Sequence, residues 1–400
     1  MTADRNGFDY PASCRRVWGT YRREKVDRVP IISPIPWGPD NDIDATTFGD
    51  WRDEERFRRV ARLVQQHCDI KPPHNRVTVP RVFEPQSYQR FLEAPQAYVE
   101  ELPPERVSGI RTRYTTLLHT PKGDLKWVYE EDEGIFTKWD MHKPIQCPED
   151  VDRLLSVPYS FDPPHPAEFD PFRAHRAEMG EYAVGGGGVN SMVAMLVGVM
   201  DYGLMLEWTL SRPDLIQTLA DTWLERTGEK VDWLLAQGVG PFWGFNGVER
   251  AAPPMMGPRQ WNQWVVPYDG EIMRRIKAAD PQARIHVHCH GKVRTMLDSF
   301  VEMGVDSTDP VEPPPQGDAD IREVKETYDG QLVFIGNIEF LDMETRQPDE
   351  IEALVRRAIE AGGKQNMMLM PSSGPHQRPS DLLLANVERY IEAGLRYGEM

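Results

Sequence analysis

From about residue 180 onward, the chain alternates short apolar stretches with long amphipathic ones. Short apolar runs at residues 182–185, 240–245, 305–308, 332–335 and 367–370 are typical of buried strands, and stretches with helical spacing separate them, as at residues 213–237 and 349–360. Residues 31–36, residues 77–80 and a histidine-rich run near residue 288 bring the candidate strands to eight. Eight strands alternating with helices predict an α/β fold, a (β/α)8 TIM barrel, formed as a single domain over residues 1–400.

Residues 108–143 interrupt this pattern. Alternating polar and apolar residues surround two turns there, Pro121-Lys-Gly-Asp124 and Glu131-Asp-Glu-Gly134, which is typical of antiparallel strands joined by hairpins. The stretch that follows, residues 148–171, is rich in Pro, Asp and His and could mark a boundary between two domains. Because strand and helix units continue after it, we expect one barrel with an early antiparallel β insertion.

The net charge and the cysteine content argue against several kinds of partner and site. A net charge of -17 argues against nucleic acids and anionic membranes as partners, because phosphate binding depends on clustered Lys and Arg. The cysteines show no paired spacing, so neither a disulfide framework nor a four-thiolate zinc site is predicted; they are Cys14, Cys68, Cys147 and Cys289. The first residues lack the apolar run of a signal peptide, and no stretch reaches membrane-spanning length. We expect a cytoplasmic protein.

The sequence Arg284-Ile-His-Val-His-Cys-His-Gly291 places three histidines at alternating positions. Alternate side chains of a strand share one face, so His286, His288 and His290 would point into the same space. His288 and His290 lie nearest the glycine that would end the strand, where barrels place their chemistry. This arrangement suits a metal ion. The competing interpretation is that one histidine is buried and hydrogen-bonded while the others lie at a polar rim.

Polar residues that follow the other predicted strands should meet these histidines at one face of the barrel. They are Asn246, Glu249, Asp309, Glu312, Asn337, Ser372, Ser373 and His376. The residues for which we predict catalytic roles are Glu249, Glu312, Asp309 and Asn337. For Glu249 and Glu312 the competing interpretation is loop solvation or an ion pair with a nearby arginine, Arg250 or Arg259.

A run of glycines, Gly185-Gly-Gly-Gly188, follows one predicted strand. It lacks the Lys-Ser/Thr that ends a P-loop and the spacing of a dinucleotide fingerprint. We predict instead a tight turn at the barrel mouth, where Gly186 and Gly187 let the backbone approach a bound molecule beside Asn246.

Several short motifs resemble, in the same order, those of the uroporphyrinogen decarboxylase superfamily, which also contains corrinoid-dependent methyltransferases. They are Asp27-Arg-Val-Pro30, Gly247-Val-Glu-Arg-Ala-Ala-Pro-Pro254, His288-Cys-His-Gly291, Gly304-Val-Asp306, Asp309-Pro-Val-Glu-Pro313 and Gly336-Asn-Ile338. The resemblance covers roughly residues 15–395. It implies a single (β/α)8 barrel with its site at the carboxyl ends of the strands.

Within that superfamily, the chain resembles the methyltransferase branch more closely than the true decarboxylases. True porphyrinogen decarboxylases carry an N-terminal Pro-x-Trp-x-Met-Arg-Gln-Ala-Gly-Arg signature, whose arginines hold the substrate carboxylates. The corresponding region here, Ile32-Ser-Pro-Ile-Pro-Trp-Gly-Pro39, lacks both arginines. A tetrapyrrole with its many carboxylates needs such cations.

The resemblance also implies a metal. The methyltransferases have a His-x-Cys-Gly zinc motif and a later cysteine; His288 matches the family histidine, His290 replaces the first cysteine, and Ser373 stands at the second. Because zinc also accepts nitrogen and oxygen ligands, His288, His290 and either His376 or Glu249 are the implied ligands. Such a zinc would lower the pKa of a thiol acceptor.

We therefore expect an enzyme that transfers a methyl group, with zinc, between a corrinoid and a small thiol-like acceptor. The chain has no Asp-x-His-x-x-Gly cobalamin motif, so a partner protein would carry the corrinoid. The alternatives are a metal-free decarboxylase of a porphyrinogen-like or smaller polycarboxylate, a metal-dependent hydrolase, and a non-catalytic small-molecule binding protein. A homodimer is common in the superfamily, and Trp261 and Trp264 would fit either an interface or a core.

Overall fold

A parallel sheet organises the computed structural model, which describes residues 7–83, 90–135 and 137–400. Its six strands run in the order β11-β10-β9-β8-β7-β6, so strands adjacent in sequence are adjacent in space. They are β6 (Gly186–Asn190), β7 (Phe242–Asn246), β8 (Arg284–Cys289), β9 (Ser307–Pro310), β10 (Val333–Ile338) and β11 (Met367–Pro371). Except for residues 182–185, which lie just before β6, the later predicted strands are confirmed within a few residues.

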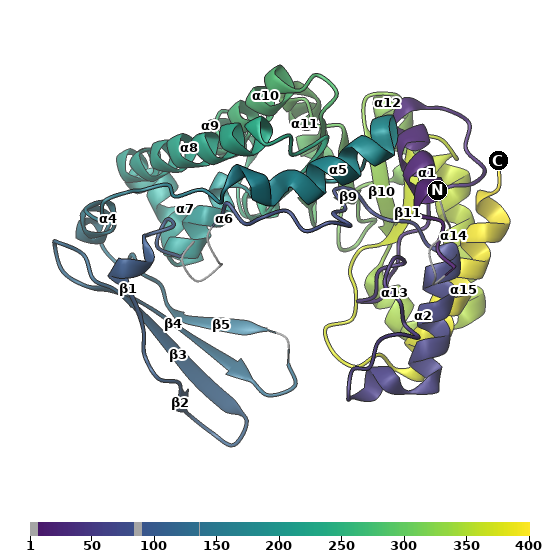
Figure 1. Ribbon diagram of the computed structural model, residues 1–400, viewed down its shortest axis with the longest axis horizontal. Helices are drawn as coiled ribbons and strands as arrows, with labels where there is room; N and C mark the ends of the chain where they lie inside the picture. Colours follow the sequence, from purple (N-terminus) through teal and green to yellow (C-terminus); the bar gives the residue numbers. More distant parts are fainter. Residues whose placement is uncertain (1–6, 84–89, 136) are drawn as a thin grey trace.

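Helices connect these strands, because parallel neighbours cannot be joined by tight turns (Figure 1). Several begin where the sequence supplies a cap or a proline: the Asp201 carboxylate accepts the N–H groups of Gly203 and Leu204, and Pro213 opens the longest helix. The helices before β8 are α1 (Tyr10–Arg22), α2 (Glu55–His67), α4 (Pro148–Leu155), α5 (Asp170–Met179), α6 (Met192–Val199), α7 (Tyr202–Ser211), α8 (Pro213–Ala236), α9 (Pro258–Trp264) and α10 (Asp269–Ala279). Those after it are α11 (Leu297–Met303), α12 (Ile321–Tyr328), α13 (Phe340–Thr345), α14 (Pro348–Gly362) and α15 (Asp381–Gly398).

The first predicted strand, residues 31–36, is reduced to two isolated bridges. Ile31 continues the sheet beyond β11 through a parallel bridge to Leu369, and Ile32 bridges in parallel to Asp69. Residues 77–80, predicted as the second strand, have no strand conformation. The predicted α/β fold with a parallel sheet is therefore confirmed. The predicted closed barrel of eight strands is not found, because no closed ring of strands forms over the described residues.

At the opposite edge of the sheet, β6 contacts the segment that follows Asp69. The Asn75 amide donates to the carbonyl of Gly186 at 2.8 Å and accepts the N–H of Gly186 at 2.8 Å. The segment after Asp69 thus lies against β6, while Asp69 itself pairs next to Ile32. Beside this amide contact, the backbone N–H of His74 donates to the carbonyl of Val184 at 3.0 Å.

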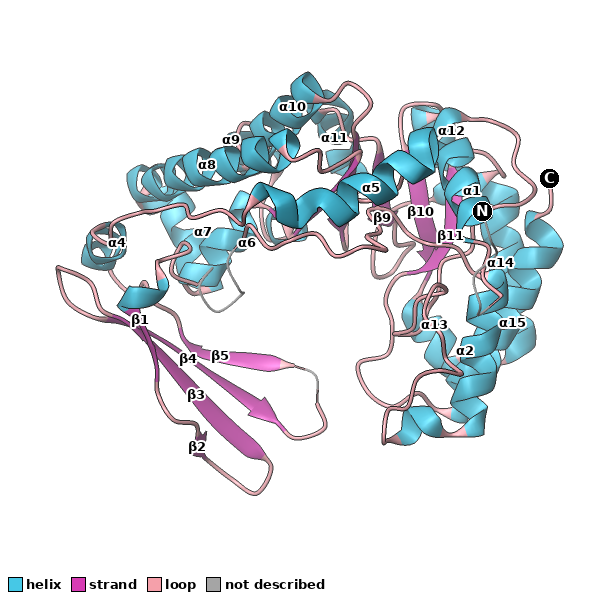
Figure 2. Ribbon diagram, in the orientation of Figure 1, coloured by secondary structure: helices cyan, strands magenta, loops and turns pink. Residues whose placement is uncertain are grey.

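An antiparallel sheet of five strands projects from the body (Figures 1 and 2). Its strands are β1 (Val99–Glu101), β2 (Glu105–Arg106), β3 (Arg111–Leu118), β4 (Leu125–Asp132) and β5 (Lys138–His142). The insertion is confirmed, but it begins at Val99 and not at Ser108. Leu118, Leu125 and Trp127 are buried with the core of the parallel sheet, and they anchor the insertion there.

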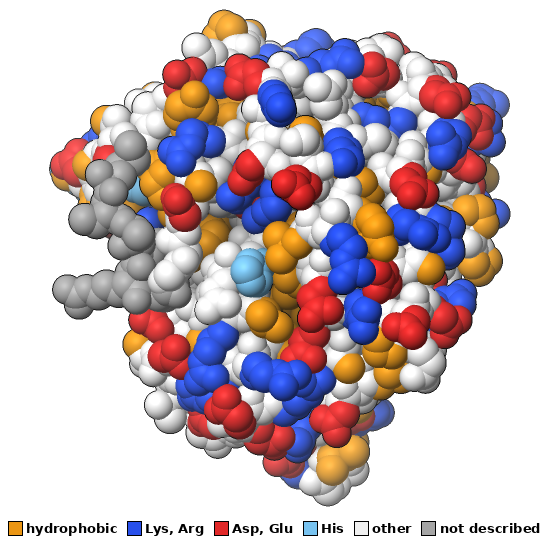
Figure 3. Space-filling model, turned by 90° about the vertical axis from the view of Figure 1, so that its right-hand side faces the viewer, with side chains coloured by type: hydrophobic (Ala, Val, Ile, Leu, Met, Phe, Trp, Pro, Cys, Tyr) orange, Lys and Arg blue, Asp and Glu red, His pale blue; other side chains and the backbone are white. Residues whose placement is uncertain are grey.

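The two tryptophans of α9 belong to the core. Trp261 and Trp264 are buried in the same cluster as Ile285 and Val287 of β8, so they do not form an exposed interface. On the face seen in Figure 3, acidic and basic side chains are interspersed with scattered apolar ones. Of the helices within the described residues, none is long and apolar enough to cross a membrane.

Candidate functional site

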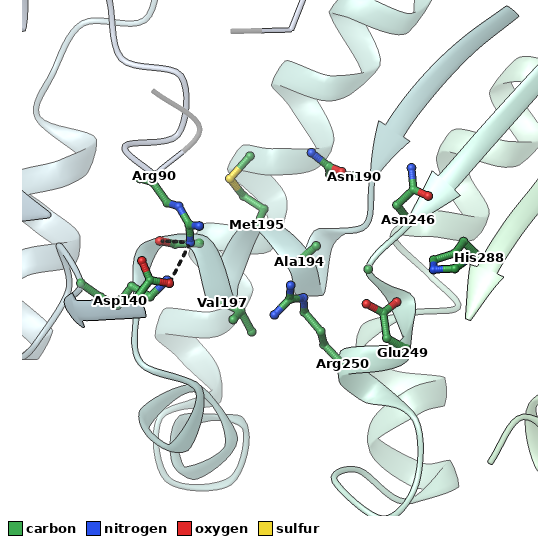
Figure 4. Close-up of a pocket in the computed structure, with 13 residues that line it drawn as sticks. Arg90, Asp140, Asn190, Ala194, Met195, Val197, Asn246, Glu249, Arg250 and His288 are labelled. Carbon is green, nitrogen blue, oxygen red and sulfur yellow. Dashed lines mark hydrogen bonds and ion pairs between the residues drawn. The ribbon is translucent and has the colours of Figure 1, made fainter. Parts of the chain in front are cut away.

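A pocket of about 230 Å³ lies at the carboxyl ends of β6, β7 and β8 (Figure 4). Its lining residues are Arg90, Asp140, Lys143, Asn190, Ala194, Met195, Val197, Gly198, Asn246, Gly247, Glu249, Arg250 and His288. Asp140 belongs to β5 and Lys143 follows it, so the antiparallel insertion forms one wall. The volume is below the range of about 300–1,000 Å³ that is usual for drug-sized ligands, which favours a small molecule.

The register of β8 and β9 brings two histidines to one carboxylate. Ser307 stands opposite His286, and Asp309 stands opposite His288. His286 Nε2 and His288 Nδ1 each lie 2.9 Å from Oδ1 of Asp309. The expectation that the histidines share a strand face is confirmed for His286 and His288, whereas His290 lies beyond the end of β8. Because a carboxylate only accepts, Nδ1 of His288 carries the hydrogen, and Nε2 is left without one in the neutral ring.

Asp309 is fully buried below the pocket. Burial alone would raise its pKa, but the ammonium of Lys71 and the hydrogen bonds from His286 and His288 hold the pKa well below its usual range. Burial lowers the pKa of His286, whose Nδ1 lies 2.9 Å from Ser307 Oγ. Asp309 therefore stays ionised and orients His288, while His286 holds Asp309 from behind.

A second histidine and carboxylate pair lies next to the first. His290 Nδ1 lies 2.9 Å from Oε1 of Glu312, and the N–H of Gly291 donates to Oε2 at 2.6 Å. The hydrogen bond to Glu312 raises the pKa of His290. Burial would raise the pKa of Glu312, but the bonds from His290 and Gly291 outweigh it and lower the pKa. The rings of His288 and His290 lie 4.6 Å apart, edge to face.

Two further glutamates carry an unpaired oxygen. Oε2 of Glu249, in the pocket, and Oε1 of Glu339 are buried without a hydrogen-bond partner among the described residues. Burial, and then the charge of Glu312, raises the pKa of Glu339 to about 7. Sequence reasoning missed Glu339, although it directly follows β10, where polar residues were expected.

Three cations of the pocket were also missed. Arg90 and Lys143 come from the segments that flank the antiparallel sheet, and no strand-end rule points to them. Arg250 follows Glu249 in a short helical turn after β7, and it was considered only as an ion-pair partner. All three line the pocket; in Figure 4, Arg90 lies on the opposite side from His288 and Asn246, and Arg250 lies between them, beside Glu249.

Other predicted residues lie elsewhere. Asn337 donates from Nδ2 to the carbonyl of Val311 at 3.0 Å, which secures the loop after β9. Gly186 and Gly187 lie inside β6 and do not form the expected turn, because this strand packs tightly: a Cβ at Gly186 would lie 1.5 Å from the carbonyl oxygen of Phe242. Asn246 does line the pocket.

Of the residues predicted to bind zinc, the structure brings two histidines together. His288 and His290 are neighbours, each with Nδ1 bound to a carboxylate, as ligating histidines often are. His376, however, is exposed in the loop after β11. Within the described ranges, no group of three His, Cys, Asp or Glu side chains could hold a metal ion. Because protein zinc sites use at least about three such ligands, the side chains as arranged do not fit a complete zinc site.

Comparisons with known proteins place this geometry in a family. The sequence matches no curated protein. A methyltransferase from Methanosarcina mazei shares the fold, with a TM-score of 0.54, 14% identity, and coverage of 96% of this chain and 98% of that one. A B12-independent methionine synthase from Shewanella sp. W3-18-1 gives a TM-score of 0.40, 10% identity and coverage of 75% of each chain. The model of the uroporphyrinogen decarboxylase (URO-D) family matches residues 129–397, more than half of the chain, so this protein belongs to the uroporphyrinogen decarboxylase family.

Proposed function

We propose that the chain is an enzyme that transfers a methyl group to a small acceptor bound in the pocket, with His288 as the base. One observation carries this proposal: the buried carboxylate of Asp309 binds Nδ1 of His288, and this leaves Nε2 as the basic nitrogen of a residue that lines the pocket. A histidine held in one tautomer by a carboxylate is the arrangement that enzymes use to remove a proton from a nucleophile.

The step is a displacement at the methyl carbon. A thiol, amine or hydroxyl is a weak nucleophile while it keeps its proton. His288 would take that proton as the acceptor atom bonds to the methyl carbon, and the electron pair of the broken bond would stay with the donor. Asp309 would stabilise the imidazolium that results. General base catalysis of this kind contributes about 10²–10⁴-fold to a rate.

The methyl donor follows from the family resemblance. We infer that a methylated corrinoid on a separate protein supplies the methyl group, because this chain has no cobalamin motif of its own. The solved structure from Methanosarcina mazei is described as a methyltransferase, which is compatible with this inference at the level of fold. The proton transfer is assigned to His288 alone, because the described residues contain no group of three ligands that could hold a metal ion beside the acceptor.

Decarboxylation of a small polycarboxylate is the second candidate. It is favoured by the cations Arg90, Lys143 and Arg250, which could hold carboxylates in the pocket. Loss of CO2 would leave a carbanion, and the imidazolium of His290, whose pKa is raised by Glu312 and whose ring lies 4.6 Å from that of His288, would supply the proton. This reaction needs no methyl donor.

The two candidates are separated by one set of assays. Purified protein is incubated with methylcobalamin and mercaptoacetate, and the absorbance change of the corrinoid and the mass of the product are followed. In parallel, CO2 release from citrate and tricarballylate is measured. We expect methylation of the thiol, a loss of about 10²-fold or more in His288→Ala, and no change in His165→Ala, since His165 is exposed on a distant 3-10 turn. CO2 release without methyl transfer would replace the first proposal by the second.

A further inference from the structure

We propose that Arg90, Lys143 and Arg250 form an oxyanion-binding wall, which holds a carboxylate or phosphate group of the substrate while its other end lies against His288. The proposal rests on the proposed function in one respect, namely that the molecule bound in this pocket is the substrate. The observations behind it concern the charge, burial and hydrogen bonding of the three cations.

Arg90 is partly buried, and most of its donors have no hydrogen-bond partner among the residues that the structure describes. Its side chain is 17% exposed, and its guanidinium lies over the ring of Trp127 at 5.0 Å. One terminal nitrogen reaches the carbonyl of Gly198 at 3.4 Å and Asp140 at 3.6 Å, both at the outer limit for such contacts. Its Nε is buried without a partner among the described residues. A rigid guanidinium with free N–H groups suits a planar, two-oxygen anion.

Lys143 is the second cation of the wall, and the carboxylate of Asp140 is its partner. Lys143 is 7% exposed and donates to Asp140, which also accepts the indole N–H of Trp127 at 2.7 Å. Asp140 is thus shared between Trp127, Lys143 and Arg90. One carboxylate engaged by three groups does not neutralise both the buried ammonium of Lys143 and the partly buried guanidinium of Arg90.

Arg250 adds a third positive charge. It is exposed at the pocket mouth. Burial is the main cause that lowers the pKa of Arg90 and of Lys143, and the charge of Arg250 lowers both further, so the three cations repel one another. A bound anion would relieve this repulsion.

The charge balance of the pocket is opposite to that of the chain. The lining contains these three cations and two carboxylates, Asp140 and Glu249, whereas the whole chain carries a charge of -17. Glu249 lies on the side of His288, away from Arg90 (Figure 4). Its unpaired buried oxygen would accept an N–H or O–H of the same ligand. The complementary molecule is small, with an oxyanion at one end and a hydrogen-bond donor at the other.

The test measures binding without turnover. Inorganic phosphate and succinate are titrated separately into the wild-type protein by calorimetry at constant ionic strength. We expect saturable binding of at least one probe, weakened about tenfold or more in Arg250→Gln and in Lys143→Gln. Arg322→Gln is the matched control, because it also removes one exposed arginine charge, on α12. Melting temperatures show that each variant is folded; Arg250 is exposed, so its variant remains informative if Lys143→Gln unfolds.

Each outcome decides the proposal. Preference for phosphate or for succinate supports the wall and identifies its anion. Equal affinities in Arg250→Gln and Arg322→Gln, or no saturable binding of either probe, overturn it. Failure of the proposed function is separate: anion binding without methyl transfer leaves the wall intact. If mercaptoacetate and the uncharged 2-mercaptoethanol are both methylated, the wall predicts that Arg250→Gln raises KM for mercaptoacetate alone, and an unchanged KM would contradict it.

Discussion

At the scale of single residues, Asp309 connects catalysis to stability. It is buried with Lys71, His286 and His288 around it. Asp309→Asn keeps the size of the side chain, but it removes the charge that fixes the tautomer of His288 and pairs with Lys71. We expect the methyl-transfer rate to fall about 10²–10⁴-fold and the protein to lose stability, as when one partner of a buried pair is removed.

Rate and melting temperature are to be measured together for this variant. Asp306→Asn is the control, because Asp306 precedes the same strand, binds Lys277 at 2.8 Å and lies outside the pocket. A wild-type rate in Asp309→Asn would rule out the role given to the carboxylate.

Asp269 provides a prediction for pH dependence. It is fully buried at the start of α10, accepts the hydroxyl of Ser191 at 2.9 Å and the N–H of Met192 at 3.3 Å, and burial raises its pKa to about 7. Since the folded pKa lies above that of the unfolded chain, about 3.9, only the folded state holds this proton between the two values. Its contribution to stability is complete below pH 4 and declines as the pH rises to 7, by about 4 kcal/mol at most.

Asp269→Asn should remove this slope. We expect the variant to be more stable than the wild type at pH 8 and to show a flatter dependence of its unfolding free energy between pH 4 and 7. Urea titrations across that range measure it. An unchanged slope would mean that Asp269 does not hold the proton.

Residue-level prediction from the sequence worked where the spacing was local. The period of two in a strand was sufficient to place His286 and His288 on one face. That both histidines bind Asp309 follows from the register between β8 and β9, and this register cannot be predicted from the sequence alone. Arg90 and Lys143 come from the two segments that flank the antiparallel sheet, and both line the pocket at the strand ends; local spacing does not predict such a contact between distant parts of the chain. The exposure of His376 depends on the path of its loop.

At the scale of elements, a buried ion pair joins α8 to the segment before the antiparallel sheet. Lys230 of α8 pairs with Glu93, and the side chains are 3% and 7% exposed. Lys230→Met would leave the Glu93 charge buried without this partner, so we expect a loss of about 3–5 kcal/mol in unfolding free energy. Replacing both residues, as Lys230→Met with Glu93→Leu, should recover most of it. Urea denaturation of the three proteins measures this, and a double variant no better than the single one would contradict it.

The glycines of β6 provide a second prediction at this scale. A Cβ at Gly186 would lie 1.5 Å from the backbone oxygen of Phe242, whereas one at Gly188 meets nothing closer than 3.9 Å. Gly186→Ala should therefore force β6 from β7 and cost about 1–3 kcal/mol or more, while Gly188→Ala should be nearly neutral. Thermal unfolding of both variants compares them directly. Equal melting temperatures would show that the strands can separate at no cost.

At the scale of the whole molecule, the alternation of strands and helices was sufficient to predict the architecture from β6 to β11. Apolar runs such as that of β11 leave few alternatives to a buried parallel strand. The start of the chain was less readable. Ile31 and Ile32, in the first predicted strand, make only single bridges between prolines, and residues 77–80, predicted as the second strand, form none. The size of the antiparallel sheet was underestimated for a related reason: β1 and β2 are too short to show a pattern.

At the scale of the whole molecule, the family resemblance and the observed side-chain geometry lead to different expectations for the metal content of the protein. The resemblance implies one zinc per chain, whereas the described residues bring together only His288 and His290, with no group of three ligands. Two histidines without a third protein ligand hold zinc weakly. We therefore expect dialysed protein to contain well under one zinc per chain, and its melting temperature to be unchanged by a chelator. Mass spectrometry of the metal content, with a His288→Ala, His290→Ala double variant as the reference, decides this. One equivalent of zinc that disappears in the double variant would mean that a side chain such as Glu249, whose buried oxygen is unpaired, moves to complete the site.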